Sequence, residues 1–451
     1  MTAARPAISW SDLRGARAGV WGLGVEGLAT LRKLATLGAH PVLVDDRPSG
    51  PVLVDDRPSG PGPGGYPVLA TAEGGLEALA TCDVVIKSPG ISRYRPEVAE
   101  LAGRGIPVAG GLGLWLAGAD RGRVACITGT KGKSSTTAIA GHLLRRWGYP
   151  CVVGGNIGQP PWDPSVPDAR YWVIETSSYQ ATDLAWSPVV VAVTSLHPDH
   201  LDWHGDVETY YRDKLSACSQ PGADLTVGNG DSAELVERTA LLGPRVQWVR
   251  AGDDPGADWM APLGLLGAHG RRNALIARAC LQGLGVREAA DDAALERAAA
   301  GFVPLAHRLQ VIGEVGGVTF VDDSLSTNVL PTLAALDAFP GRRVALIAGG
   351  HDRGIDYAPL AAGLAAREWP ALVLTVPDSG PRVRAAIEAA EPAKVDVVAC
   401  EDLDTAVERG FGWALPDGVV LLSPAAPSFG AFRDYADRGE AFARAMNACQ
   451  A

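Results

Sequence analysis

One segment near the middle of the chain constrains the fold more than any other. Residues 124–137 read V-A-C-I-T-G-T-K-G-K-S-S-T-T, an apolar strand-like run, a glycine-rich turn and the start of a helical pattern. Such a turn cradles phosphate, because backbone N–H groups and the helix N-terminus face the anion. The spacing G-x-x-G-K-S is two residues shorter than the usual G-x-x-x-x-G-K-[ST] loop. This departure restricts the protein families that the segment fits more than a standard loop would. The candidate phosphate-contacting residues are Gly129, Thr130, Lys131, Gly132, Lys133, Ser134 and Ser135.

Composition narrows the cellular setting. The net charge of −11 argues against non-specific binding to nucleic acids or anionic membranes, although a nucleotide needs only a local positive site. No apolar stretch reaches membrane-spanning length, and residues 1–12 lack the pattern of a secretory signal. The seven cysteines are scattered without C-x-x-C pairs, which favours a reduced protein. We therefore expect a cytoplasmic protein with no nucleic-acid or membrane partner.

The pattern of the whole chain predicts an α/β fold. Apolar strand-like runs alternate with Ala/Leu-rich helical patterns, which is typical of parallel sheets. Strand-like runs include residues 18–22, 84–86, 171–174, 189–194, 344–347 and 419–422. A chain of 451 residues is too long for one ordinary core, and composition changes near residues 116–122 and 301–305. These breaks predict domains at residues 1–118, 119–304 and 305–451.

A short internal repeat interrupts the first predicted domain. Residues 41–50 and 51–60 are the same ten residues, P-V-L-V-D-D-R-P-S-G. A solenoid needs at least three stacked units, so the repeat indicates a local duplication or a sequencing artefact rather than a repeat fold. One copy can supply the second strand, and the other must then be looped out. The sequence does not decide which copy has which role.

The front of the chain carries a glycine-rich turn after its first strand. The turn reads G-L-G-V-E-G, acidic residues follow about 20 positions later, and a second loop, S-P-G-I-S, follows another strand. This is the shape of a dinucleotide fingerprint, but a glycine turn without any ligand explains it equally well. The pattern also does not distinguish NAD from another nucleotide diphosphate. The candidate binding residues are Gly22, Gly24, Gly27, Asp45, Asp46, Ser88 and Gly90.

Polar residues follow two strands of the central region. Glu175 ends the strand at residues 171–174, where opposite Ser134 it could hold magnesium; the alternative is an exposed glutamate at a strand end. The loop S-L-H-P-D-H-L-D, which contains His200, fits either a metal or substrate site or a solvated polar loop. Lys214 lies on a helical pattern at residues 207–218, and this position alone favours a surface lysine.

Three strand-end loops mark the last domain. They read D-D-S-L-S-T-N (residues 322–328), G-G-H-D-R-G-I-D-Y (349–357) and S-P-A-A-P-S-F-G-A-F (423–432). Turns rich in side-chain–backbone bonds are one interpretation of such loops. Together they could instead form a site for carboxylates, with Arg353 and hydroxyl groups as donors.

Taken in order, the motifs resemble those of the Mur ligases. The motifs are T-G-T-K-G-K-S-S-T, G-G-N-I-G, E-T-S-S-Y-Q, D-H-L-D, A-H-R-L and D-D-S-x-S-T-N, and the resemblance covers nearly the whole chain. It is strongest to members that add glutamate to UDP-N-acetylmuramoyl-L-alanine. The resemblance implies a Rossmann-like UDP-binding domain, a central P-loop ATPase-type domain and a C-terminal Rossmann-like domain. It also implies ATP and Mg²⁺ as cofactors and an acyl-phosphate intermediate. Separately from the resemblance, we expect a monomer.

The resemblance also assigns roles to particular residues. The front glycines and acidic residues would hold the UDP part, not a dinucleotide, and Asn156 would contact the muramoyl group. The phosphate loop would bind ATP together with Asn273, Arg308 and Asp323, whereas a second family asparagine is replaced by Gly270. Magnesium would be held by Ser134, Glu175, His200 and a carbamylated Lys214. The residues implied in catalysis are Lys133, His200 and Lys214. The residues implied in glutamate binding are Thr327, Arg353, Ser423 and Phe429.

Two departures concern the amino acid that is added. Ligases for D-glutamate usually carry lysine at the positions of Leu325 and Arg353, and they tend to have another small residue before the serine of S-P-A-A-P-S-F. Losing one cation and repositioning another changes how the two carboxylates of glutamate are bound. The pattern resembles the less common branch that adds L-glutamate. D-glutamate remains the alternative.

Three other classes compete with this interpretation. An NAD-linked oxidoreductase would explain the front glycines but not the phosphate loop. A folylpolyglutamate-type ligase shares the central chemistry but not the front nucleotide-fold domain. A non-enzymatic scaffold would not need Glu175, His200 and Lys214 all in place, although the repeat beside the expected uridine site could block it.

Overall fold

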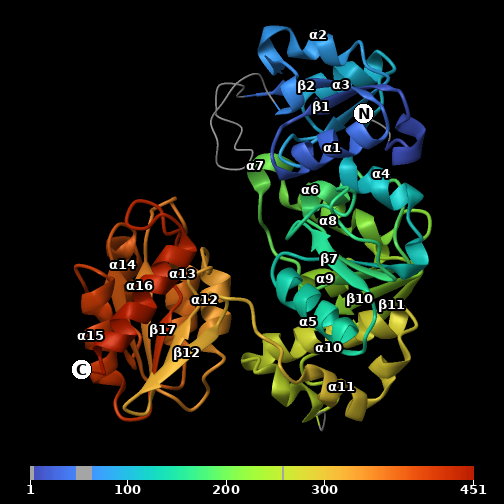
Figure 1. Ribbon diagram of the computed structural model, residues 1–451. Coiled ribbons are helices and arrows are strands. Elements are labelled where there is room, and N and C mark those ends of the chain that lie inside the picture. Colours follow the sequence, from blue (N-terminus) through green and yellow to red (C-terminus); the bar gives the residue numbers. More distant parts are fainter. Residues whose placement is uncertain (1–4, 47–62, 256–257, 451) are drawn as a thin grey trace. The chain divides into compact units, whose positions relative to one another are not determined.

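The computed structural model of the chain describes residues 5–46, 63–255 and 258–450 (Figure 1). These residues form three sheets flanked by helices, which confirms the α/β fold class. By their contacts, the residues divide into one unit of Met1–Pro262 with Arg272–Phe302 and another of Leu263–Arg271 with Val303–Ala451. The first unit contains the first two sheets, and the second unit contains the third.

The first sheet is parallel in the strand order β3-β2-β1-β4-β5. Its elements are β1 (Arg17–Trp21), α1 (Val25–Thr36), β2 (His40–Asp45), β3 (Val68–Ala70), α2 (Leu76–Leu79), β4 (Val84–Lys87), α3 (Pro96–Gly103), β5 (Val108–Gly110) and α4 (Gly111–Gly118). Leucines of α1 and α4 pack on one face, and those of α2 and α3 pack on the other. Strand β2 comes from the first copy of the repeat. The second copy, residues 51–60, lies outside the described residues.

The second sheet is also parallel, in the order β11-β10-β9-β6-β8-β7. Its elements are β6 (Val124–Thr128), α5 (Lys133–Arg146), β7 (Cys151–Gly155), β8 (Tyr171–Glu175), α6 (Ser178–Ala181), β9 (Val190–Val193), α7 (Leu201–His204), α8 (Val207–Leu215), β10 (Leu225–Asn229), α9 (Ala233–Glu237), β11 (Arg245–Val249), α10 (Gly267–Gly283) and α11 (Asp292–Ala299). Strand β6 is buried along its whole length, as expected for a strand covered on both faces. The phosphate loop, which follows β6 directly, therefore starts from a strand in the interior of the domain.

Buried polar contacts join the first two sheets. Lys87 Nζ lies 2.5 Å from Asp183 Oδ2, and both side chains are buried. Gln180 Nε2 donates to Glu26 Oε1 at 2.6 Å, so the helix after the front glycine turn contacts the E-T-S-S-Y-Q motif. One apolar cluster also extends from the first sheet into the second. The two sheets thus form one packed body.

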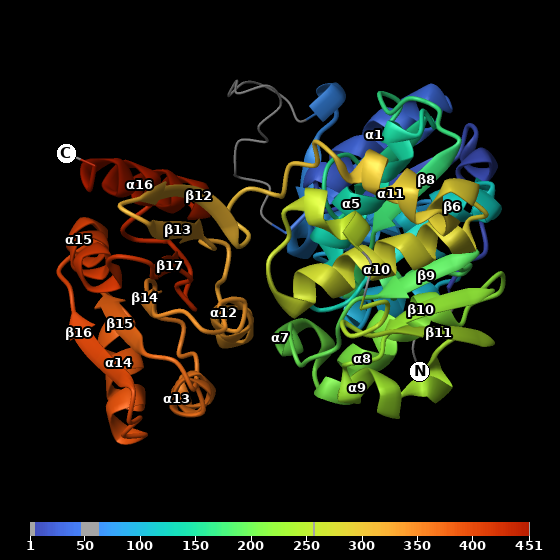
Figure 2. The ribbon, with the colours of Figure 1, turned by 90° about the horizontal axis from the view of Figure 1, so that it is seen from below.

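The third sheet has the order β12-β13-β17-β14-β15-β16, with β12 antiparallel to β13 and the other pairs parallel (Figure 2). Its elements are β12 (Gln310–Val315), β13 (Val318–Asp322), α12 (Val329–Leu336), β14 (Val344–Gly349), α13 (Ala358–Ala365), β15 (Ala371–Val376), α14 (Gly380–Ala389), β16 (Val395–Ala399), α15 (Leu403–Ala414), β17 (Val419–Leu422) and α16 (Tyr435–Ala448). Helices α12, α13 and α14 cover one face, and α15 and α16 cover the other. The first turns of α10, up to Arg271, group with this unit.

Candidate active site

The phosphate loop follows β6 and is tightly packed. Gly129 and Gly132 have φ of +134° and +91°, which only glycine adopts without strain. A Cβ at Gly129 would lie 2.9 Å from Ser195 N, and one at Gly132 would lie 2.8 Å from Asn273 Oδ1. Helix α5 starts at Lys133, so Ser134, which is buried, and Ser135, which is half-buried, occupy its first turn. The loop has the compact geometry of an anion cradle, and Asn273 lies against it.

A second loop, after β9, holds the phosphate loop in place. Ser195 Oγ accepts from Lys131 N at 2.8 Å, and Ser195 O accepts from Thr130 N at 2.9 Å. Thr194 Oγ1 donates to Lys131 O at 2.6 Å. These bonds arise because β9 is the direct neighbour of β6, so the two strand-end loops meet. Sequence reasoning missed Thr194 and Ser195, although their position directly after a buried strand was a usable signal.

Two lysines converge on one carbonyl of the loop. Lys133 Nζ donates to Gly129 O at 3.0 Å, and Lys214 Nζ donates to the same oxygen at 3.1 Å. Lys214 is only 2% exposed, so the surface position favoured by its helical pattern is wrong. Burial, with Lys133 nearby, lowers the pKa of Lys214 well below its usual value. A buried amine of this kind is chemically reactive, because its neutral form is populated more readily.

Glu175 offers an unused oxygen at the end of β8. It pairs in register with Ile127 of β6, and it is 1% exposed. Its Oε1 accepts from Asn156 Nδ2 at 2.7 Å. Its Oε2 is buried and has no hydrogen-bond partner among the described residues. A buried carboxylate oxygen normally has a partner, so this one fits a cation, and a hard oxygen ligand suits magnesium.

His200 lies at the start of α7 in a left-handed backbone conformation, with φ of +52°. Its side chain is half-exposed, and its Nε2 lies 3.8 Å from Asp199 Oδ2. Lys131 Nζ also approaches Asp199 Oδ2, at 3.7 Å, which brings this loop beside the phosphate loop. Burial lowers the pKa of His200, which favours the neutral imidazole that metals bind. Among the described residues, no cluster of three or more His, Cys, Asp or Glu side chains has a metal-binding arrangement.

The front glycine turn meets the S-P-G-I-S loop. Ser88 Oγ donates to Gly22 O at 2.6 Å, and a Cβ at Gly22 would lie 2.9 Å from Ser88 Cβ. Gly27 packs against the Gly22 carbonyl, where a side chain would collide. Gly24 caps α1, Gly90 follows in the S-P-G turn, and Asp45 Oδ2 accepts from Leu23 N at 2.8 Å. The structure therefore brings these predicted residues together at the ends of β1, β2 and β4.

Asp46 lies beside a small cavity of the same domain. The cavity measures about 480 Å³, and its lining includes Asp46, Thr71 and Arg95. Thr71 Oγ1 donates to Asp46 Oδ1 at 2.7 Å, and Arg95 Nη1 lies 2.5 Å from Asp46 Oδ2. Thr71 and Arg95 were not singled out in the sequence, because neither belongs to a glycine-rich motif. Charged and hydroxyl side chains therefore line part of this cavity in the front domain.

In the second unit, Asp323 is the centre of a buried hydrogen-bond network. Its Oδ2 accepts from Ser326 Oγ at 2.5 Å and from Ser423 Oγ at 2.7 Å, and its Oδ1 accepts from Leu309 N at 3.0 Å. Burial raises the pKa of Asp323 to about 6. Arg308 is adjacent to this network through Leu309. Ser423 is fully buried, and its hydroxyl hydrogen-bonds with Asp323 and Thr332; its role in glutamate binding stays a prediction.

The other predicted glutamate-binding residues are more accessible. Thr327 is half-buried, whereas Arg353 and Phe429 are exposed, the latter at 59%. The Phe429 ring packs edge-on against His351 at 6.5 Å. Arg353 makes no hydrogen bond or ion pair with any residue that the structure describes. Two of the three strand-end loops thus present side chains that are available to a ligand.

Comparison with known proteins agrees with this arrangement. Three Mur ligase models match the chain: a MurD-like N-terminal domain over residues 16–110, the middle domain over 127–262 and the glutamate ligase domain over 307–426. A UDP-N-acetylmuramoyl-L-alanine–L-glutamate ligase from Micromonospora sp. is 44% identical and covers 97% of each chain. A protein of the same name from Salinispora tropica is 42% identical and covers 97% of this chain and 98% of its own.

The chain belongs to the Mur ligase family. Solved structures agree at the level of the fold. The UDP-N-acetylmuramate–alanine ligase of Thermotoga maritima has a TM-score of 0.52 and 18% identity, covering 96% of this Mur ligase and 99% of its own chain. MurF of Acinetobacter baumannii has a TM-score of 0.55 and 14% identity, covering 91% and 90%.

This Mur ligase contains a further polar network that the sequence did not reveal. His204 Nδ1 lies 2.7 Å from Asp213 Oδ2, and His204 Nε2 lies 3.0 Å from Ser178 Oγ. Tyr94 Oη donates to Asp213 Oδ1 at 2.7 Å. The network links α7 and α8 to the E-T-S-S-Y-Q motif and to the front domain, and so it positions the helix that carries Lys214.

In the part of the chain that is described, no helix is long and apolar enough to cross a membrane.

Proposed function

We propose that this Mur ligase uses ATP to join L-glutamate to UDP-N-acetylmuramoyl-L-alanine, a step of peptidoglycan precursor synthesis. Relatives bearing that name are 42–44% identical over nearly the entire chain. The observation that carries the proposal is the convergence of Lys133 and Lys214 on the short phosphate loop, with the unpartnered oxygen of Glu175 at the end of the neighbouring strand. An amide-forming ATPase needs a cation, here Lys133, and metal-binding groups around the transferred phosphate.

The proposed reaction has two chemical steps. A carboxylate oxygen of the UDP-sugar substrate attacks the γ-phosphorus of ATP, and the bond to the leaving ADP breaks. The amine of glutamate then attacks the acyl carbon, and phosphate leaves as the amine loses its proton. Because the first step brings anions together, positive charge must be supplied by Lys133 and the loop N–H groups. Magnesium, held by Ser134, Glu175 and His200, would neutralise further phosphate charge.

Lys214 has a separate role in this scheme. Its lowered pKa makes the neutral amine available to react with carbon dioxide, and the resulting carbamate is an anion. This conversion would replace a buried cation by a further oxygen ligand for the metal. It would also remove the charge repulsion between Lys214 and Lys133.

In the third domain, glutamate would contact Thr327, Arg353, Ser423 and Phe429. The Ser423 hydroxyl also bonds to Asp323. Leu325 and Arg353 stand where ligases for D-glutamate usually have lysines, and this supports L-glutamate as the substrate. UDP would occupy the cavity beside Asp46, with its diphosphate near Gly22 and Gly24. Arg308, Asp323 and Asn273 would complete the ATP site.

We further propose a monomeric cytoplasmic enzyme whose partners are its small-molecule substrates. The compartment is supported by the cysteines, which all lie in described regions and are free thiols. ATP and a UDP-linked precursor are likewise available in the cytoplasm.

The test is ATP-dependent phosphate release with UDP-N-acetylmuramoyl-L-alanine and each enantiomer of glutamate. L-glutamate should support turnover, and D-glutamate should support much less. A clear preference for D-glutamate would still support the proposed ligase activity, but it would reject L-glutamate as the substrate. Activity with a folate acceptor in place of the UDP-sugar would instead favour the folylpolyglutamate-type alternative.

A further inference from the structure

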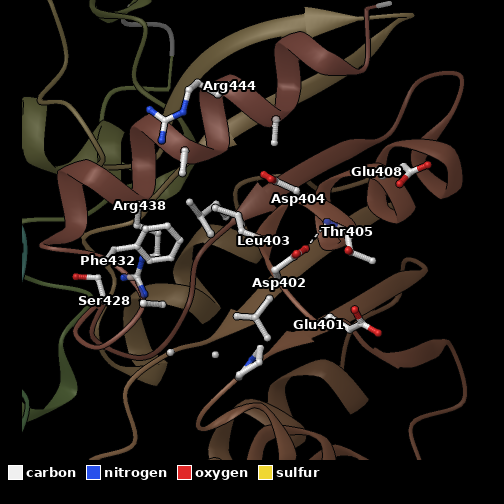
Figure 3. Close-up of a pocket in the computed structure, with 18 of the residues that line it drawn as sticks. Glu401, Asp402, Leu403, Asp404, Thr405, Glu408, Ser428, Phe432, Arg438 and Arg444 are labelled. Carbon is white, nitrogen blue, oxygen red and sulfur yellow. Dashed lines mark hydrogen bonds between the residues drawn. The ribbon is translucent and has the colours of Figure 1, made fainter.

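A large cavity lies between α15 and α16 of the third domain (Figure 3). It measures about 1100 Å³, and it reaches the carboxyl ends of β14, β15 and β17. None of the residues assigned above to ATP, UDP or glutamate lines it. It is therefore a separate space on the helical face formed by α15 and α16.

The sheet topology explains why a cavity forms here. Strands β14 and β17 are neighbours, but α13, which follows β14, and α16, which follows β17, cover opposite faces. The two chain segments diverge, and such a switch point is where open α/β sheets bind ligands. Gly350 has φ of +142°, and a Cβ there would lie 2.4 Å from Pro427 O and 3.0 Å from Arg438 Nη1, so the glycine backbone packs directly against the guanidinium. The floor of the cavity is thus backbone and a guanidinium.

Arg438 supplies a buried cation to this cavity. It is 3% exposed; its Nε donates to Ser324 Oγ at 3.0 Å, and its Nη2 donates to Ser324 O at 2.7 Å and to Ala426 O at 3.1 Å. Its Nη1 is buried without a hydrogen-bond partner, and no described carboxylate lies within ion-pair distance. Burial lowers the pKa of Arg438 to about 10, so the group stays charged at neutral pH. Figure 3 shows the guanidinium beside Ser428 and Phe432.

The far end of the cavity has the opposite charge. Four carboxylates line it, against one exposed cation, Arg444. The carboxylates are Glu401, Asp402, Asp404 and Glu408. Asp402 caps α15 by accepting from Thr405 N at 2.8 Å, and this bond lowers its pKa, so it is ionised at neutral pH. This end of the cavity disfavours nucleotides and dicarboxylates, which would bring a second negative charge to it.

The walls between the two ends are apolar. Phe411, Phe432, Leu403 and Leu422 face the cavity, together with small alanines of α16. Such walls bind an aromatic ring or an aliphatic chain by removing it from water. A ligand that satisfies all three regions has one anionic group and an apolar body.

We propose that this cavity binds an organic monocarboxylate with an aromatic or aliphatic body, whose carboxylate pairs with Arg438 Nη1. The site is independent of the ligase reaction. Its floor and one end, Gly350 and Ser428, belong to the same loops as Arg353 and Phe429. The cavity therefore adjoins the loops of the proposed glutamate site without sharing any residue assigned to that site.

The test uses 4-phenylbutyrate as the probe and calorimetry on the full-length protein. The acid should bind at one site per chain, at least about tenfold more tightly than the uncharged 4-phenylbutyramide, because only the acid makes a charge-assisted hydrogen bond. The variant Ala441→Trp fills the cavity and should abolish binding. The matched variant Ala443→Trp changes a half-buried alanine of the same helix outside the lining and should retain binding.

Alkylation of Cys449 gives a second readout on the unmodified protein. Cys449 lines the cavity and is half-buried, and Cys151, half-buried in the second sheet, serves as the internal control. The acid should slow the reaction of Cys449 with iodoacetamide and leave Cys151 unchanged, with or without saturating L-glutamate. Equal binding of acid and amide, no binding at millimolar concentration, or displacement by L-glutamate would overturn the proposal. None of these outcomes depends on whether the ligase reaction occurs.

Discussion

Glu175→Gln separates the metal-binding role of Glu175 from its structural role. The substitution keeps the shape of the side chain. In the wild type, Asn156 Nδ2 donates to Glu175 Oε1 at 2.7 Å, and the Oε1 of a glutamine can accept the same hydrogen bond. The change falls on Oε2, the buried oxygen without a partner in the described structure. The variant therefore loses a negative charge and one potential metal ligand, and little else.

The expected magnitudes differ for stability and activity. An amide group at Oε2 leaves a buried donor unpaired, which costs about 1–3 kcal/mol, while removal of a desolvated charge offsets part of that cost. The melting temperature should therefore change by only a few degrees. Loss of a preorganised charged group beside the transferred phosphate should lower kcat about a hundredfold to a thousandfold.

The assay is phosphate release as a function of magnesium concentration. Glu175→Gln should need more magnesium for half-maximal activity and should stay slow at saturation. Glu237→Gln is the matched control, because its carboxylate is 72% exposed on the same domain, and it should behave like the wild type. If Glu175→Gln keeps wild-type turnover and magnesium dependence, Glu175 does not hold the metal.

Three further variants test other parts of the structure. Asp183→Asn should lower the free energy of unfolding by about 3–5 kcal/mol in denaturant titrations, because it leaves Lys87 charged and buried; a loss below about 1 kcal/mol would contradict the buried pair. The pKa of Asp323 is raised from 3.8 to about 6, so the folded state holds its proton longer than the unfolded state. The free energy of unfolding should therefore fall by about 3 kcal/mol as pH rises from 3.8 to about 6. Asp323→Asn should abolish this pH dependence, and an unchanged dependence would show that other groups cause it. Gly132→Ala should weaken ADP binding at least about tenfold in calorimetry, because φ is +91° and the new Cβ meets Asn273; wild-type affinity would show that the loop can move.

The fold and the phosphate loop were predictable because they depend on local patterns. Alternating strand and helix signals define the α/β class, and the order glycine, lysine, hydroxyl between a strand and a helix defines the loop. The first copy of the repeat supplies β2, which the sequence left open because the copies are identical. Burial of a polar side chain was harder to predict, since it depends on what packs against a helix.

Lys214 and Ser423 show that limit. A lysine on an amphipathic helix has the same local pattern whether the facing surface is water or, as here, the carbonyl of Gly129. Ser423 follows a strand as ligand-binding serines do, and its contact with Asp323 arises only because β17 lies beside β13 in the folded sheet. The network around His204 was likewise invisible, because its members are spread over distant segments.

The central claim is that ATP activates the carboxylate of a UDP-sugar substrate as an acyl phosphate. The most direct measurement uses UDP-N-acetylmuramoyl-L-alanine labelled with heavy oxygen in its terminal carboxylate, with ATP and L-glutamate. Mass spectrometry of the released phosphate should find one labelled oxygen in each phosphate derived from a labelled carboxylate, because the carboxylate oxygen stays with phosphorus when the amide forms. Amide product accompanied by unlabelled phosphate would contradict the account.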